Sequence, residues 1–163
     1  MHASFAPKVL NWYAASAGHI VALVTEDSHR KQISALVADD DDQNARLLVR
    51  ILETGGYGTI ECTTDSQKVL SLCSELKPDL LLLDVSMPSP NGFEILESLA
   101  EPDQPDPVVV MLTGHDHPSI ERRALELGAV AVVGKSTSMR DLLDRLDQVL
   151  VRAGRMPEED FGN

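Results

Sequence analysis

The amino-acid sequence predicts an α/β fold, a doubly wound (βα)5 unit built around a five-stranded parallel sheet. Short apolar runs alternate five times with longer segments whose apolar residues recur at helical spacing. The short runs are apolar throughout, which is typical of parallel strands that are covered on both faces. The chain has 163 residues, which is long enough for one domain with a buried core.

The expected elements follow in order along the chain, separated by turn and capping signals. The strands are expected at 33–38, 59–62, 80–85, 107–112 and 129–133. The helices are expected at 45–52, 69–76, 93–99, 118–128 and 138–151. Gly55-Gly56 ends the first helix, Asp65 caps the second, and Pro118 suits the first turn of the fourth. Right-handed crossovers between successive strands then give the doubly wound sheet.

Three parts of the chain differ in composition. Residues 1–32 are predicted to be an N-terminal extension with little or no fixed structure, because they are rich in alanine and show no sustained period. A short helix around Val9 to Ala17, a mobile arm and an artefact of an upstream start codon all remain open there. Residues 33–152 are predicted to form the folded domain, and residues 153–163 a polar C-terminal tail.

The composition argues against several classes of protein. The formal net charge is −12, and such an acidic surface repels phosphate backbones and anionic lipid. Direct binding to nucleic acid or to a membrane is therefore not expected. The longest apolar runs, such as 20–24, fall far short of the roughly 20 residues that a bilayer requires. We expect a cytoplasmic protein in which Cys62 and Cys73 are both buried and unpaired.

Polar side chains stand at the carboxyl ends of four of the expected strands. Asp39 and Asp40 follow the first strand, and Asp84 lies at the end of the third. Thr113 follows the fourth strand, and Lys135 follows the fifth. The carboxyl ends of parallel strands meet at one edge of a doubly wound sheet, where ligands bind. We therefore expect these five side chains to lie close together.

This set of side chains suits the handling of a phosphoryl group. Carboxylates a few ångströms apart repel each other by about 4 kcal/mol per pair at an effective dielectric constant near 20, and Mg²⁺ with its hard oxygen ligands relieves that repulsion. Lys135 and Thr113 offer a cation and a hydroxyl donor to phosphoryl oxygens. A carboxylate such as Asp84 can itself be the nucleophile and form an acyl phosphate. Taken singly, the aspartates also have an interpretation as capping residues, and Lys135 as a solvated surface cation.

Residues 33–152 resemble the receiver domain of response regulators in two-component signalling. The motifs that carry the resemblance are 36–40 (LVADD), 77–88 (KPDLLLLDVSMP) with Gly92, 111–114 (MLTG), and Gly128-Ala129 leading to Lys135. The stretch around Asp84, with its Met-Pro and the glycine eight residues after the aspartate, is highly specific. The resemblance implies the flavodoxin-like receiver topology.

The resemblance also implies roles for individual residues. Asp84 would be the phosphoacceptor, and it would take its phosphoryl group from a histidine of a sensor histidine kinase or a histidine phosphotransfer protein. Asp39 and Asp40 would hold Mg²⁺ together with Asp84 and the backbone carbonyl of Ser86.

Further residues would act on the phosphoryl group once it is bound. Thr113 and Lys135 would bind it. Ser86 and His115 would flank the approach of the water that hydrolyses the acyl phosphate, and they would modulate its lifetime.

In this interpretation the chain is a signalling switch that catalyses only its own phosphorylation and dephosphorylation. Phosphorylation would change the surface formed by 118–128, 129–133 and 138–151. The output would be a downstream effector protein, or an output domain that followed Asn163 in a longer regulator.

The sequence departs from the family pattern at three places. Ser136 stands where a proline usually follows the lysine, and Val132 replaces the aromatic residue that commonly changes rotamer on activation. Val130-Ala131 replaces an acidic pair, which weakens the case for one subfamily's salt-bridged dimer. None of these departures removes a residue of the expected phosphorylation site.

Other functions fit less well. A metal-dependent aspartyl phosphatase-like enzyme is the main alternative, but it would need a second acid two residues after the nucleophile, where Ser86 stands. A flavodoxin-like nucleotide carrier would need a Gly/Ser/Thr-rich phosphate loop after the first strand, where this chain has four aspartates. His115 and His117 have the spacing of a metal-binding pair, although a loop that leads into a helix explains them more simply.

Overall fold

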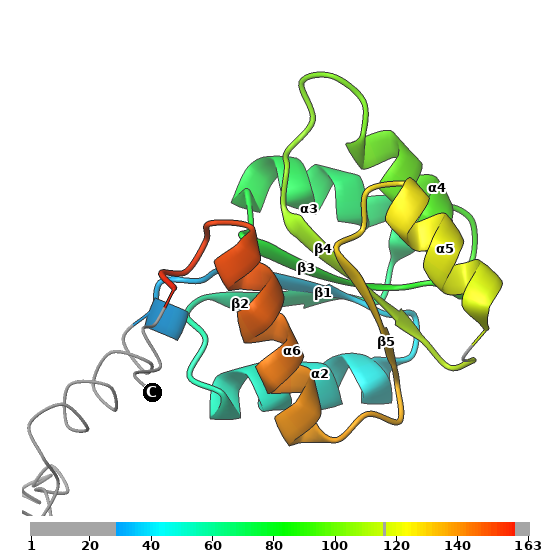
Figure 1. The fold of residues 1–163 in the computed structure, drawn as a ribbon. Helices are drawn as coiled ribbons and strands as arrows, with labels where there is room; N and C mark the ends of the chain where they lie inside the picture. The colour runs from blue at the N-terminus through cyan, green and yellow to red at the C-terminus, as the bar shows by residue number, and fades with distance from the viewer. Residues whose placement is uncertain (1–28, 116, 159–163) are drawn as a thin grey trace, which may run out of the picture.

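The computed structural model describes residues 29–115 and 117–158, and it confirms the predicted α/β fold with one five-stranded parallel sheet (Figure 1). The strands are β1 (Ala35–Ala38), β2 (Ile60–Thr63), β3 (Leu80–Asp84), β4 (Val108–Thr113) and β5 (Ala131–Gly134). The helices are α2 (Asp42–Thr54), α3 (Val69–Leu76), α4 (Gly92–Leu99), α5 (Pro118–Glu126) and α6 (Met139–Arg152), with a 3₁₀ turn, η1 (Ser66–Lys68), before α3.

The strand order in the sheet is β2-β1-β3-β4-β5. The chain therefore runs from β1 outwards to β2 and then returns to the other side of β1, where it adds β3, β4 and β5. The topological switch point lies between β1 and β3. Ligands of doubly wound sheets bind beyond the carboxyl ends of the strands at such a point.

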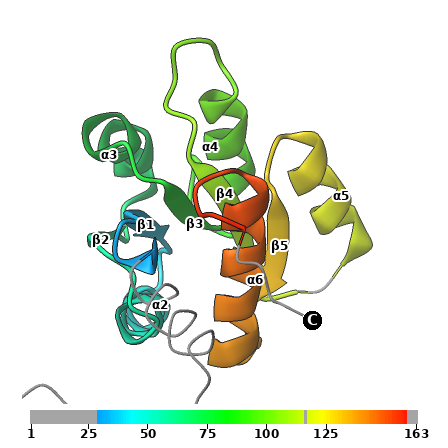
Figure 2. The same ribbon diagram turned by 60° about the vertical axis from the view of Figure 1, so that its left-hand side comes forward.

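Helices cover both faces of the sheet. Side chains alternate between the faces along each strand, so Val37 and Leu82 pack towards α2 and α6, whereas Leu36 and Leu83 pack towards α3, α4 and α5. Figures 1 and 2 show α2 and α6 on one side of the sheet and the other three helices on the opposite side. This double coverage is the reason that the central strands read as continuously apolar.

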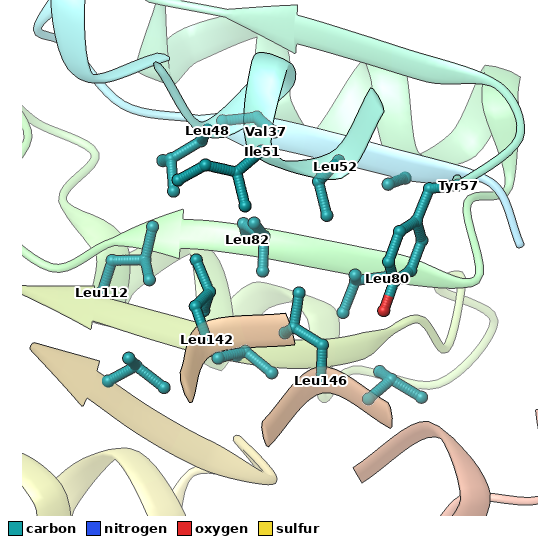
Figure 3. Packing of buried hydrophobic residues seen from close by; sticks show 14 of the residues in the cluster. Val37, Leu48, Ile51, Leu52, Tyr57, Leu80, Leu82, Leu112, Leu142 and Leu146 are labelled. Atoms are coloured by element: carbon teal, nitrogen blue, oxygen red, sulfur yellow. The ribbon is translucent and has the colours of Figure 1, made fainter. Parts of the chain in front are cut away.

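Figure 3 shows the core layer between the sheet and the pair α2 and α6. Leu80 and Leu82 of β3 are fully buried in this layer, together with Leu52 of α2 and Leu146 of α6. Burial of one such side chain contributes roughly 1.5–3 kcal/mol. All five residues of β3 are buried, including the last one, Asp84. The core thus holds this aspartate at a fixed position on the edge of the sheet.

The helix starts follow the expected capping chemistry. Asp65 caps the turn before the second helix by accepting a hydrogen bond from Gln67 N, although η1 stands between this cap and α3. Pro118 occupies the first turn of α5, as predicted. Asn91 and Glu94 form a reciprocal capping box at the start of α4. Within the described part of the chain, no helix is both long enough and apolar enough to cross a bilayer.

One prediction about the cysteines is wrong. Cys73 is buried under the sheet, but Cys62 is exposed. Cys62 lies in β2, which pairs with β1 alone among the strands of the described residues and forms an edge of the sheet. No residue of this strand is fully buried. Only the central strands of the sheet are buried on both faces. A prediction of burial from apolar residues alone therefore overestimates the burial of a short edge strand.

Arg30 joins the start of the described region to the helical layer of α2 and α6. Its guanidinium makes a two-pronged contact with the Asp147 carboxylate, with Nε 2.9 Å from Oδ1 and Nη2 close to Oδ2, and Nη1 donates to Gly55 O at 3.0 Å. Tyr57 donates its hydroxyl hydrogen to Asp147 Oδ1 at 3.3 Å, and burial together with the nearby Asp147 raises the pKa of this phenol. The possible helix at 9–17 lies outside the described residues.

The segment after α6 also contacts the domain. Arg155 Nη2 donates to Asp106 O at 2.7 Å, and its Nη1 lies 3.6 Å from Asp79 Oδ1. Met156 packs against the core. The two contacts of Arg155 lie at the amino end of the sheet, because Asp79 shortly precedes β3 and Asp106 shortly precedes β4.

Candidate functional site

Two buried carboxylates lie side by side at the carboxyl edge of the sheet. Asp39 directly follows β1 and is 0% exposed, and Asp84 ends β3 and is 1% exposed. Ala38 pairs with Leu83 in the register of these neighbouring strands, which brings the two aspartates together. Asp40 is exposed, and one carboxylate oxygen from each of the three aspartates lies within 4.8 Å of the others.

The ammonium group of Lys135 bridges the two buried carboxylates. Lys135 Nζ lies 2.7 Å from Asp39 Oδ2 and 3.1 Å from Asp84 Oδ2, and the lysine side chain is 24% exposed. The lysine backbone N–H donates to Thr113 O at 2.8 Å, which ties the segment after β5 to the end of β4. Three strands therefore contribute to one cluster of two anions and one cation.

Backbone N–H groups fix the orientation of the buried carboxylates. Asp41 N donates to Asp39 Oδ1 at 3.0 Å, and Ser86 N donates to Asp84 Oδ1 at 3.2 Å. In each carboxylate the other oxygen, Oδ2, faces Lys135. Buried polar groups that are held in this way keep a single geometry, so the site is organised before any ligand arrives.

Burial and neighbouring charges have opposite effects on the pKa values of Asp84 and Lys135. Burial raises the pKa of Asp84 and is the largest effect; the Ser86 N–H and Lys135 lower this pKa without cancelling the effect of burial, and the Asp39 carboxylate raises it further. Burial alone would lower the pKa of Lys135, but the two carboxylates more than compensate and raise it above its usual range. Any additional positive charge nearby would therefore stabilise the ionised form of Asp84.

The predicted hydroxyl donor, Thr113, is present at the same edge but is engaged elsewhere. Thr113 is the last residue of β4 and is 3% exposed. Its Oγ1 donates to His115 O at 3.0 Å and accepts from His115 N at 3.1 Å, which forms a local turn. The Thr113 hydroxyl is therefore already paired within its own loop.

The two residues expected to modulate the site are both exposed. Ser86 follows the phosphoacceptor candidate by two residues and uses its backbone N–H on Asp84. His115 contacts Thr113 through its backbone, and its ring lies on the surface. The structure therefore brings Asp39, Asp40, Asp84 and Lys135 together. Ser86 and Thr113 are joined to this cluster through backbone hydrogen bonds, and His115 is joined to Thr113.

Gly92 allows α4 to begin directly against the site. A Cβ atom at this position would lie 2.2 Å from Asp84 O and 2.9 Å from Met111 Cε. Gly92 N also donates to Val85 O at 3.2 Å. A side chain at this position would push the start of α4 away from the Asp84 backbone. Steric crowding therefore explains why a glycine stands at position 92.

A small cavity of about 50 Å³ extends from the carboxylate cluster between α2 and α6. Asn44 and Thr137 contribute polar side chains to its lining, next to Asp39 and Lys135. Neither residue was among the predicted site residues. A single sequence does not indicate that a polar residue in a helix or a loop will line a site. Asn44 and Thr137 come to the same cavity because α2 packs against the end of β5.

A second cavity, of about 280 Å³, lies between α5 and β5 beside Thr113. Val132 of β5 lines it and is half-buried. The remaining lining residues are all on or next to the start of α5: His117, Pro118, Ile120 and Glu121. The small side chain of Val132 leaves this space open next to the end of β4.

The three aspartates fit a Mg²⁺ ion. Asp39 Oδ2 is buried and accepts no well-directed hydrogen bond, although Lys135 Nζ is close to it as a counter-ion. The donor set consists of carboxylate oxygens, and Asp40 is exposed and can share a hydrated ion. Mg²⁺ prefers hard oxygen ligands and usually keeps several waters, so a site at the surface edge of the sheet suits it.

Comparisons with known proteins identify the family of the chain. A family model described as the response regulator receiver domain matches residues 35–147. The receiver domain of a DNA-binding response regulator from Colwellia psychrerythraea is 26% identical, with a TM-score of 0.67 over 73% of this chain and 98% of that chain. A chemotaxis protein of Vibrio cholerae is 25% identical, with a TM-score of 0.67 over 72% of this chain and 98% of that chain.

The receiver domain of the response regulator NarL from Mycobacterium tuberculosis is also similar, with 26% identity and a TM-score of 0.66 over 73% of this chain and 97% of that chain. The family match spans the whole sheet, from the first residue of β1 to beyond the end of β5. It includes every residue of the carboxylate and lysine cluster. The chain belongs to the family of response regulator receiver domains.

Proposed function

We propose that Asp84 receives a phosphoryl group from a histidine of a sensor histidine kinase or a histidine phosphotransfer protein. A carboxylate oxygen of Asp84 bonds to phosphorus as the P–N bond to the histidine breaks, and the electron pair of that bond stays on the imidazole nitrogen. The observation that carries this proposal is the Lys135 ammonium between the buried carboxylates of Asp39 and Asp84. Incubation with acetyl phosphate and Mg²⁺ tests it, because the intact mass should rise by one phosphoryl group.

The residues of the site divide the work of this transfer. Ser86 N and Lys135 hold the Asp84 carboxylate in one orientation, which aligns its oxygen with the incoming phosphorus. Lys135 then turns to the new phosphoryl oxygens, whose charge replaces the charge of the carboxylate. Asp39, Asp40, Asp84 and the backbone carbonyl of Ser86 would hold Mg²⁺, which neutralises charge on the phosphoryl oxygens when it is bound.

The switch is proposed to run through Thr113. A dianionic phosphoryl group on Asp84 attracts the Thr113 hydroxyl, which would leave its turn with His115. The segment between β4 and α5 then moves, and the surface of α5, β5 and α6 changes. Because Val132 replaces an aromatic residue, this change would be a movement of backbone and loop, with no ring rotation.

The proposed role is that of a switch in a cytoplasmic phosphorelay. The exposed free thiol of Cys62 fits a reducing compartment. The readout would be a downstream effector protein or an output domain of a longer regulator. The aspartyl phosphatase-like alternative predicts turnover of a generic phosphate ester, whereas the switch predicts one stable label per chain.

Asp40→Ala is expected to remove the response of the protein to Mg²⁺. In the wild type, Mg²⁺ at 100 times its dissociation constant should raise the free energy of unfolding by about 2.7 kcal/mol, because it binds only the folded state. The variant should lose most of this rise, and without metal it should melt at a higher temperature than the wild type because one repulsive carboxylate is gone. Thermal melts with and without Mg²⁺ measure both effects.

Glu53→Gln is the matched control for this experiment. Glu53 is an exposed acid near the far end of α2, so its removal changes the net charge by the same amount without touching the site. A Mg²⁺ response in Asp40→Ala equal to that of this control would contradict the proposed metal site.

His115→Ala is expected to change the lifetime of the phosphorylated protein several-fold and to leave phosphorylation by acetyl phosphate nearly unchanged. Hydrolysis of the acyl phosphate needs a water in line with the leaving carboxylate oxygen, and the resemblance to receiver domains implies that the exposed His115 would flank that approach. Faster loss in the variant would mean that the ring blocks the water, and slower loss that it holds the water. Identical decay of the label in both proteins from pH 6 to 8 would exclude a role for His115.

A further inference from the structure

Helix α5 begins with a histidine as its N-cap. His117 has extended backbone angles, φ −131° and ψ 127°, and its Nδ1 accepts a hydrogen bond from Ser119 N at 3.3 Å. The same Nδ1 lies 2.7 Å from Ser119 Oγ. The helices α2, α4 and α6 are capped instead by Asp41, Asn91 and Ser138, which are among the usual N-cap residues.

A histidine differs from these caps because a proton can abolish its function. Nδ1 accepts the Ser119 N–H only while it carries a lone pair, so the capped form of His117 carries its proton on Nε2. A proton on Nδ1 makes this atom a donor, which leaves the Ser119 N–H without its partner. It also places a positive charge at the positive end of the helix dipole. Both effects destabilise the first turn of α5.

The groups around His117 do not restore the lost cap. Ser119 Oγ, 2.7 Å from Nδ1, can accept a hydrogen bond from the protonated ring, but this contact leaves the Ser119 N–H without a partner. The His117 side chain lines the cavity of about 280 Å³ between α5 and β5. β4 and β5 contribute the uncharged Thr113 and Val132, and Glu121 of α5 is the charged group among the described lining residues. Glu121 attracts an imidazolium, and such a pairing would draw the ring away from Ser119. His115 precedes it on the surface, and Asp116 lies outside the described residues.

We propose that His117 is a proton-sensitive cap, so that the first turn of α5 loses order when the ring gains a proton. Histidine is the side chain type that ordinarily gains a proton in mild acid. The consequence for signalling rests on the proposed function: α5 follows Thr113 after a short loop, so a loosened first turn eases the departure of Thr113 from its turn with His115. Acid would then favour the rearranged surface even at constant phosphorylation.

Amide hydrogen exchange on the unphosphorylated chain tests this proposal. Protection factors, corrected for intrinsic exchange at each pH, are measured for residues 121–123 by NMR. In the wild type they should fall about fivefold from pH 7.5 to pH 5, as expected for the loss of one N-cap. His117→Asn keeps a capping side chain that does not titrate, so its protection should stay constant. His117→Ala should show low protection at both pH values.

His115→Asn is the matched control, because it removes a neighbouring histidine that does not cap the helix. This control should keep the wild-type fall. Constant protection in the wild type would overturn the proposal, as would an equal fall in His117→Asn or the loss of the fall in His115→Asn. Labelling of the same samples by acetyl phosphate reports on Asp84 separately. Absence of label would refute the proposed function and leave the result for α5 intact.

Discussion

Asp84→Asn is expected to abolish phosphorylation of the chain. Acetyl phosphate with Mg²⁺ should add one phosphoryl group to the wild type and none to the variant, because an amide oxygen is a poor nucleophile. Asp39 is equally buried and is held in a similar way, by the Asp41 N–H and by Lys135, so the variant also tests whether Asp39 can take the label instead. Intact-mass measurements over time give the stoichiometry directly.

Asp41→Asn is the control for this variant. Asp41 lies two residues from Asp39 and caps α2 with its side chain, and asparagine caps equally well. This control removes one negative charge close to the site and should still be labelled once. Full labelling of Asp84→Asn at another residue would contradict the assignment of the phosphoacceptor.

The Asp84→Asn variant should also be more stable than the metal-free wild type near neutral pH. Burial raises the pKa of Asp84 above its ordinary value of 3.8, so the folded state is penalised by the charge once the pH exceeds that value. The stability gain of the neutral variant should therefore be small at acidic pH and should grow as the pH rises through the raised pKa. Denaturant titrations from pH 4 to pH 8 measure this difference.

Lys135→Met is expected to lower the free energy of unfolding at neutral pH by about 3 kcal/mol, because it leaves two buried carboxylates without their counter-ion. Lys135 Nζ lies 2.7 Å from Asp39 Oδ2 and 3.1 Å from Asp84 Oδ2, so one substitution breaks both ion pairs. The carboxylates raise the pKa of Lys135 above its ordinary value of 10.5. The stability that this lysine contributes is complete below that value and is lost as the pH rises through the raised pKa, so the difference should narrow in strong alkali.

Lys68→Met controls for the loss of a lysine. Its ammonium lies 3.7 Å from Asp65 Oδ2 on the surface, and the lysine side chain is 69% exposed. Such a pair contributes about 0–1 kcal/mol. The double variant Asp84→Asn/Lys135→Met should recover part of the loss, because one unpaired charge is gone. Equal stability of Lys135→Met and Lys68→Met would show that the buried cluster does not depend on its cation.

Much of the site could be predicted because it depends on strand ends. Asp39, Asp84, Thr113 and Lys135 each follow an apolar run, and parallel strands bring such positions to one edge whatever the details of packing. The same periodicity overestimated the burial of Cys62, because an apolar pattern does not distinguish an edge strand from a central one. It also could not place η1 before α3, since a 3₁₀ turn leaves no distinct apolar period.

The contacts that escaped prediction depend on tertiary packing or on local hydrogen bonds. Arg30 and Asp147 are 117 positions apart, and their pairing follows from the packing of α6 beside α2. The turn between Thr113 Oγ1 and the backbone of His115 is a local alternative to a contact with the site, and a hydroxyl side chain allows both. Asn44 and Thr137 line the same cavity only because two helices converge on the end of β5.

The most direct test of the central claim is to locate the label in the wild-type protein. Borohydride reduces an aspartyl phosphate to homoserine, which marks the modified residue permanently, and fragment masses then identify its position. The account predicts that homoserine replaces Asp84 alone, in the peptide that contains the end of β3. Homoserine at Asp39 or Asp40, or a stable label on a histidine, would contradict it.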